Sequence, residues 1–142
     1  MSAHLDASVL LPTIVEQPAS AAVDRFCLDW PDTLIMSDFA AAEVASGLSR
    51  LVRTRYLELD DAQARLADFD TWRAGATVAA DLAAADARLA NTYVRHFELM
   101  LRAPDALHAA ICRRLGLTLV TLDRRLAEAA RVLGLSVQIP ST

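Results

Sequence analysis

Four acidic residues stand at positions from which their side chains could act together. Asp6 follows a short apolar run, Glu43 lies among alanines, Asp105 opens the apolar stretch "DALHAA", and Asp123 ends the run "LTLVTLD". Carboxylates that are brought together repel one another, and burial raises their pKa values until some stay protonated. A hard divalent cation removes this conflict, and ligation by oxygen alone suits Mg²⁺ or Mn²⁺. The chemistry that these acids indicate is metal-assisted hydrolysis of a phosphodiester.

Short apolar strands that alternate with helices would bring these acids to one place. Strands are predicted in "AHLD", where the strand ends at Asp6 and a helix starts near Ser8, in "TLIM", in "LTLVTLD" and in "LSVQI". The pattern predicts an α/β fold, with a mostly parallel sheet of about four to five short strands flanked by helices. Binding sites of such sheets lie outside the carboxyl ends of the strands, so residues at those ends converge.

Helices are predicted between the strands and place the remaining two acids. Their predicted ranges are 18–29, 37–55 with Ser37 as N-cap, 60–75, 78–101, 104–116 and 124–134. Glu43 then lies about a turn and a half into the helix after "TLIM", and Asp105 lies in the first turn of its helix. All four acids are therefore expected at one rim of the sheet.

Four segments together resemble a known family. They are "LDASVLL" (5–11), "SDFAAAEVASGL" (37–48), "LRAPDALHAAIC" (101–112) and "LTLVTLDRRLAEAARVLGLSV" (117–137). In order, spacing and total length they resemble the motif blocks of the PIN-domain family, in particular the VapC-like toxin ribonucleases of bacterial toxin–antitoxin pairs.

The resemblance implies a metal-dependent endoribonuclease with a Rossmann-like sheet and one or two Mg²⁺ or Mn²⁺ ions. It also implies an RNA substrate, a homodimer and an antitoxin partner. Carried over by position, the acidic metal-site residues are Asp6, Glu43, Asp105 and Asp123. The hydroxyl residues Ser8 and Thr121 match positions that help to hold the acids or bound water.

Charge offers no general attraction for nucleic acid. The formal net charge is −4, and all fourteen basic residues are arginines. RNA must therefore be held locally, and the candidates for phosphate contact are Arg102, Arg113, Arg114, Arg124 and Arg125. The same arginines could be solvated helix faces.

Ordinary structural roles stand beside the chemical ones. Asp105 suits the positive end of a helix dipole, and Asp123 suits an N-cap. His108 shares a helix face with Asp105, but because a hard cation does not seek imidazole, a packed histidine is the favoured interpretation. His4 and His96 have no acid at ligand spacing and receive no role.

Length and composition predict the number of domains, the state of the cysteines and the location of the protein. With 142 residues, 54% of them hydrophobic, one domain spanning 1–142 is expected. Cys27 and Cys112 have neither a disulfide framework nor a zinc spacing and are expected in the core. No basic leader and no long apolar run is present, which predicts a soluble, cytoplasmic protein without a membrane partner.

The prediction from sequence is an endoribonuclease toxin. The rival is a non-catalytic PIN-fold binding or regulatory protein that acts through a protein partner. Cleavage of DNA stays open as a third possibility, because metal-carboxylate chemistry on phosphodiesters does not itself require a 2′-hydroxyl.

Overall fold

The computed structural model describes residues 1–141 and contains a sheet of five short strands, all parallel. The strands are β1 (Ala3–Leu5), β2 (Leu34–Ser37), β3 (Val78–Ala80), β4 (Thr118–Val120) and β5 (Val137–Gln138). The predicted α/β fold with a sheet of four to five mostly parallel strands is confirmed.

Strand β1 lies at the centre of the sheet. The order is β3-β2-β1-β4-β5, and Ala3 pairs with Leu34 of β2 on one side and with Thr118 of β4 on the other. All three residues of β1 are buried, because helices cover both faces of the sheet. The carboxyl ends of β1, β2 and β4 therefore lie side by side.

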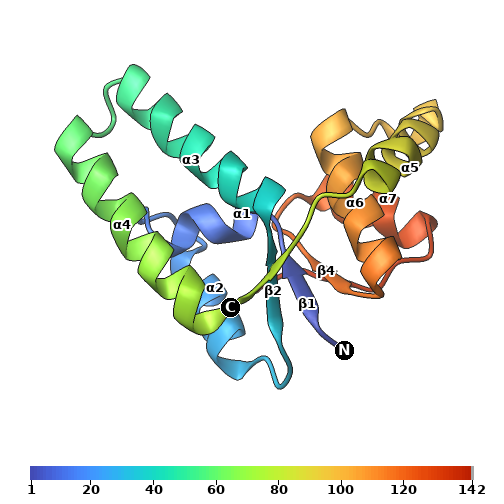
Figure 1. The fold of residues 1–142 in the computed structure, drawn as a ribbon, viewed down its shortest axis with the longest axis horizontal. Coiled ribbons are helices and arrows are strands. Elements are labelled where there is room, and N and C mark those ends of the chain that lie inside the picture. Colours follow the sequence, from blue (N-terminus) through green and yellow to red (C-terminus); the bar gives the residue numbers. More distant parts are fainter. Residues whose placement is uncertain (142) are drawn as a thin grey trace.

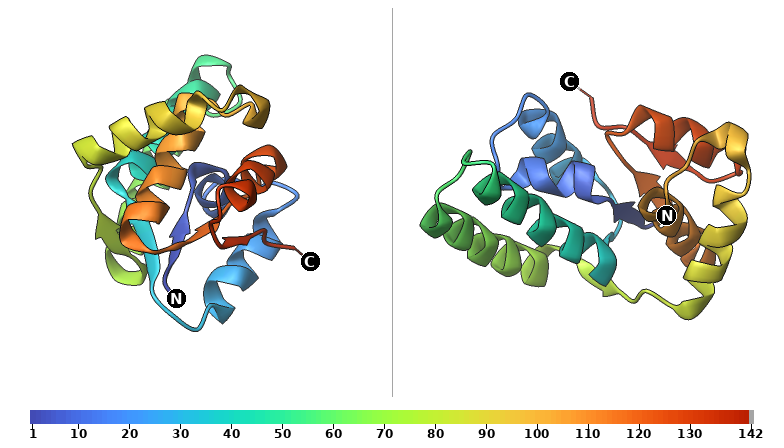
Figure 2. Two further views of the ribbon diagram at one scale, coloured as in Figure 1. Left: turned by 90° about the vertical axis from the view of Figure 1, so that its right-hand side faces the viewer. Right: turned by 90° about the horizontal axis from the view of Figure 1, so that it is seen from above.

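Helices lie on both sides of the sheet (Figure 1). Those along the chain are α1 (Ala7–Leu10), the 3₁₀ turn η1 (Leu11–Thr13), α2 (Ser20–Asp29), α3 (Asp38–Arg53), α4 (Leu59–Ala76), α5 (Ala84–Val94), the 3₁₀ turn η2 (Phe97–Leu99), α6 (Ala103–Leu115) and α7 (Arg124–Val132). Helices α3 and α4 form an antiparallel pair on one side of the central strands, while α5, α6 and α7 lie on the other (Figure 1). Figure 2 shows the same separation from above. None of the helices within residues 1–141 is long and apolar enough to cross a membrane.

The apolar core has separate parts on the two sides. Leu5, Met36 and Phe69 are fully buried where β1 and β2 pack against α1 to α4. Leu119 and Leu126 are buried where β4 packs against α7 and the end of α6. This packing fixes helices on both sides of the carboxyl edge of the sheet.

The long helix predicted over 78–101 is wrong. Residues Val78–Ala80 form β3, α5 begins only at Ala84 and ends at Val94, and η2 follows. Alanine favours helix by intrinsic propensity, but here the backbone pairs with β2, Val78 lying opposite Ile35. Tertiary pairing has overridden the local preference, and β3 is an exposed edge strand with two of its three residues outside the core.

Two helix starts also differ from the prediction. Helix α1 begins at Ala7, and its N-cap is Asp6, whose side chain accepts from Val9 N–H, so Ser8 lies inside the helix. Helix α2 begins at Ser20, two residues after the predicted start at Pro18. The N-cap role of Ser37 is confirmed, because its Oγ accepts from Ala40 N–H at 3.0 Å.

Candidate metal centre

Three of the four acids follow directly from the parallel topology. Asp6 comes after β1, Asp123 comes three residues after the end of β4, and Glu43 lies in α3, which starts where β2 ends. Helix α6 leads into β4 and so has its N-terminus, with Asp105, at the carboxyl edge of the sheet. We refer to Asp6, Glu43, Asp105 and Asp123 as the carboxylate rim; in Figure 1 the carboxyl ends of β1 and β2 point toward α3 and α6.

Asp6 is the most buried member of the rim. The residue is 4% exposed. Its Oδ1 accepts from Ser8 Oγ at 2.5 Å and from Val9 N–H at 3.2 Å. Burial raises the pKa of the Asp6 carboxyl above its usual value, although His108 and the neighbouring hydroxyls oppose this effect. Among residues 1–141 no arginine or amine pairs with this carboxylate.

Two hydroxyl groups connect Asp6 to the end of β4. Ser8 Oγ donates to Asp6, accepts from Leu122 N–H at 2.9 Å and lies 3.3 Å from Thr121 Oγ1. Thr121 Oγ1 in turn accepts from Asp123 N–H at 3.0 Å. Ser8 and Thr121 therefore hold the segments that carry Asp6 and Asp123 next to each other.

Glu43 is bonded to a buried pair of histidines. Glu43 Oε1 lies 2.5 Å from His108 Nε2, and His108 Nδ1 lies 2.9 Å from His4 Nε2. His4 is 0% exposed and His108 is 3% exposed. Burial, with the nearby His108 as the smaller cause, lowers the pKa of His4 to about 3, so the His4 ring is neutral at physiological pH.

The other two acids take the ordinary roles that the sequence also allowed. Asp123 is the N-cap of α7, and its Oδ1 accepts from the backbone N–H groups of Arg125 and Leu126 at 3.0 and 3.2 Å. Asp105 lies in the first turn of α6, with its Oδ2 3.5 Å from Arg102 Nε.

The backbone thus places the four residues of the carboxylate rim at one edge of the sheet, but their side chains form hydrogen bonds with different partners. Among residues 1–141 no three carboxylate, imidazole or thiol groups come close enough together to hold one ion. The hydrogen bonds found within these residues end on one oxygen of each acid: Asp6 Oδ1, Glu43 Oε1, Asp105 Oδ2 and Asp123 Oδ1. Each carboxylate keeps a second oxygen, which is the donor that Mg²⁺ or Mn²⁺ prefers, and its first oxygen is held as in known metal sites. The chemistry of this donor set, four carboxylates with one oxygen left free on each, therefore suits such an ion, while the four side chains stand apart in this structure.

The five arginines proposed to contact phosphate divide into two groups. Arg114 is paired with Asp86 and Asp81, and Arg113 donates to the Leu133 carbonyl oxygen. Both are engaged within the protein. Arg102, Arg124 and Arg125 are exposed close in sequence to Asp105 and Asp123.

Sequence reasoning gave His4 no role, and the structure places it beside His108. The two residues are 104 positions apart, and no local spacing connects them. The one available signal was a histidine in the middle of a strand with only apolar neighbours, because a polar group buried there needs a hydrogen-bond partner.

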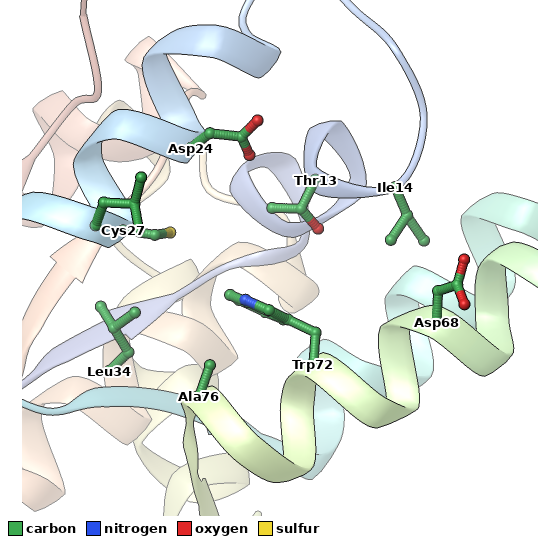
Figure 3. Close-up of a pocket in the computed structure, with 9 residues that line it drawn as sticks. Thr13, Ile14, Asp24, Cys27, Leu34, Asp68, Trp72 and Ala76 are labelled. Carbon is green, nitrogen blue, oxygen red and sulfur yellow. The ribbon is translucent and has the colours of Figure 1, made fainter.

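A separate apolar groove lies away from the rim, between α2 and α4 with η1 beside them (Figure 3). Its volume is about 550 Å³, and it is lined by Thr13, Ile14, Asp24, Cys27, Leu28, Leu34, Asp68, Trp72 and Ala76. Cys27 is only half-buried, contrary to the core position expected for it, whereas Cys112 is fully buried. The groove contains none of the four acids.

The fold and the rim define a class of protein. A profile of the PIN domain matches residues 3–132, which is most of the chain. This chain belongs to the PIN-domain family.

Individual relatives agree with this assignment. The chain is 31% identical to Ribonuclease VapC46 of Mycobacterium tuberculosis over 143 residues, which cover 97% of each chain. Its fold is similar to that of M. tuberculosis VapC20, a Sarcin-Ricin loop cleaving toxin, with a TM-score of 0.72, 16% identity, and coverage of 89% of this chain and 94% of VapC20. DNA-bound VapBC from Salmonella typhimurium matches with a TM-score of 0.72, 17% identity and 99% of both chains.

Proposed function

We propose that this chain is a metal-dependent endoribonuclease that hydrolyses RNA phosphodiester bonds, and that it is the toxin of a type II toxin–antitoxin pair. Its relative VapC46 is named a ribonuclease, and the likeness covers nearly the whole of both chains. The proposal includes an RNA substrate, a cognate antitoxin, a homodimer and a cytoplasmic location.

One observation carries the catalytic part of the proposal. Asp6 is a buried carboxylate at the carboxyl end of the central strand, its pKa is raised by burial, and within residues 1–141 it has no ion-pair partner. A buried carboxylate without a cation is costly to the folded state. A divalent ion bound to Asp6 would remove that cost and would explain why this carboxylate is buried.

The acids and the arginines have different roles in this proposal. Asp6, Glu43, Asp105 and Asp123 would hold one or two ions through the oxygens that their own hydrogen bonds leave free. A bound Mg²⁺ or Mn²⁺ would supply positive charge for the phosphate oxygens and would lower the pKa of an attacking water. The exposed arginines Arg102, Arg124 and Arg125 would position the RNA backbone by contacts to phosphate.

The apolar groove of Figure 3 supports the antitoxin partner. It is open to solvent, is lined mainly by apolar side chains, and carries the exposed acids Asp24 and Asp68. This combination suits an amphipathic segment of a partner that bears both apolar and basic residues.

The experiment compares purified wild-type protein with Asp6→Asn, using RNA in the presence of Mg²⁺ or Mn²⁺ and again with a chelator. Asparagine still caps α1, so the fold should persist while the charge is lost. The rate of RNA cleavage should fall by about a hundredfold or more in Asp6→Asn, and the chelator should abolish wild-type cleavage.

Asp29→Asn is the matched control, because Asp29 is exposed at the end of α2 and lies outside the rim. It should cleave like the wild type. Equal rates in Asp6→Asn and the wild type would refute the metal site, and cleavage of single-stranded DNA in preference to RNA would refute the substrate. Inactivity of the wild type on both, together with tight binding to an antitoxin, would favour the rival, a non-catalytic binding protein.

A further inference from the structure

His4, His108 and Glu43 are linked by two hydrogen bonds, and the chemistry of the three groups determines which atom donates in each. The chain of contacts runs from β1 through α6 to α3, with distances of 2.9 Å and 2.5 Å. The ring centroids of the two histidines lie 5.2 Å apart, and the Phe39 ring lies 5.3 Å from that of His108. Both rings are therefore fixed in place.

The Glu43 carboxylate determines the donor in the first hydrogen bond. An ionised carboxylate only accepts, so His108 Nε2 must carry the proton that is donated to Glu43. The second contact, between His108 Nδ1 and His4 Nε2, needs one donor and one acceptor, and the other nitrogen of the His4 ring decides which is which.

The His4 end of this chain of contacts determines the direction of the second hydrogen bond. His4 Nδ1 is buried and has no hydrogen-bond partner among residues 1–141. As a donor it would be an unsatisfied buried N–H, which native structures rarely tolerate, whereas an unprotonated nitrogen is the less costly group to leave unpaired. The His4 proton is therefore on Nε2, which donates to His108 Nδ1, and both histidines are assigned the Nε2–H tautomer.

We infer that His4 is a positioning residue for the proposed metal site: by donating to His108 Nδ1 it keeps the His108 Nε2–H directed at Glu43 Oε1 and leaves Glu43 Oε2 for the ion. This inference rests on the proposed function. Residues that hold a metal-ligating carboxylate contribute about tenfold to hundredfold to metal affinity. Without the donor at position 4, His108 can move its proton to Nδ1 and turn a lone pair toward the Glu43 carboxylate, which repels it.

The test uses two substitutions of similar bulk that differ in hydrogen bonding. His4→Phe keeps a ring in the strand but has no donor, whereas His4→Gln keeps an N–H donor at the end of its side chain. His96→Phe is the control, because the His96 side chain is half-exposed and lies 3.6 Å from Glu98, outside the rim. The dissociation constant for Mn²⁺ is measured by calorimetry on each purified protein, the melting temperature is recorded without metal, and ¹⁵N NMR of the side chains reports the tautomers.

The expected result is the Nε2–H tautomer for both His4 and His108 in the wild type. Mn²⁺ should bind about tenfold to hundredfold more weakly to His4→Phe, while His4→Gln and His96→Phe should bind close to the wild type. A protonated His108 Nδ1 in the wild type would overturn the inference, and so would equal Mn²⁺ affinities in His4→Phe and His4→Gln.

The proposed function can fail separately. If the wild type binds Mn²⁺ and Asp6→Asn does not, the metal site stands whatever the His4 variants show. If the wild type does not bind Mn²⁺, the metal site is refuted, and the positioning role of His4 is refuted with it.

Discussion

Arg114 offers a sharp choice between a structural role and an RNA-binding role. Its guanidinium makes two bonds to the carboxylate of Asp86, from Nε to Oδ1 at 2.8 Å and from Nη2 to Oδ2 at 2.9 Å, and also contacts Asp81. Asp86 is 1% exposed, and its Oδ2 also accepts from Ala83 N–H at the start of α5. Arg114 therefore joins α5 to α6 through a buried carboxylate.

The cost of Arg114→Ala follows from that burial. Removing one partner of a buried ion pair costs about 3 to 5 kcal/mol. Because the Arg114 side chain is 27% exposed and water can enter its place, we expect the lower end, about 3 kcal/mol of unfolding free energy. For a chain of 142 residues this corresponds to a fall of roughly 10 °C in melting temperature.

The loss should depend on pH, and the sign can be worked out. Burial raises the pKa of Asp86, but the hydrogen bonds from Arg114 and Ala83 outweigh it, so that the net pKa lies below the usual value. The carboxylate therefore stabilises the folded state above its unfolded pKa, and this stability is lost as the pH falls through the folded pKa. In Arg114→Ala burial acts without the cation and raises the pKa, so the variant regains stability relative to the wild type as the pH falls.

Urea denaturation at pH 7 and near pH 4 measures both effects. Arg88→Ala is the matched control, because Arg88 lies exposed on α5 and should change stability by no more than about 0.5 kcal/mol. The reasoning is refuted if Arg114→Ala is as stable as Arg88→Ala, or if its loss is the same at both pH values. Weaker RNA binding with unchanged stability would return Arg114 to the phosphate-contact group.

Two further predictions concern surfaces. Arg124→Ala and Arg125→Ala should weaken RNA binding and leave the melting temperature unchanged. The slope of log K for RNA binding against log salt concentration should become shallower by about 0.7 for each phosphate contact that is lost. Binding assays at several salt concentrations measure this slope, and a slope equal to that of the wild type would contradict the prediction. Leu28 is 86% exposed at the apolar groove, so Leu28→Arg should fold normally and keep RNA cleavage. Its affinity for the antitoxin, the protein encoded by a short adjacent reading frame, should fall about tenfold or more, as measured by calorimetry.

The sequence predicted the parts of the fold that have strong local patterns. The apolar runs before Asp6 and Asp123 and the Ser37 cap are visible in neighbouring residues, and each is found in the structure. Strand β3 was missed because Val78 is its only β-branched residue and alanine follows it. Its pairing with β2 lies more than forty positions away and leaves no local trace.

The four acids of the candidate site could be selected from the sequence, but their hydrogen-bond partners could not. A carboxylate after an apolar strand of a parallel sheet has a general meaning, which is why Asp6 and Asp123 could be selected. The contact between His4 and His108 depends on how α6 packs against β1, and the ion pair of Arg114 depends on how α5 packs against α6. Packing of elements that are distant in sequence cannot be read from the spacing of residues within one element.

The structural roles of Asp6 and Asp123 are compatible with the metal-ligand roles proposed for them. Asp123 caps α7 through Oδ1, and Asp6 caps α1 through Oδ1, so each of the two acids satisfies backbone donors with one oxygen. The cap holds the carboxylate in one orientation, which directs the second oxygen and reduces the entropy that an ion would have to remove. An acid that looks ordinary as a helix cap is for this reason a well-prepared ligand, and a carboxylate free of any such bond would be a poorer one.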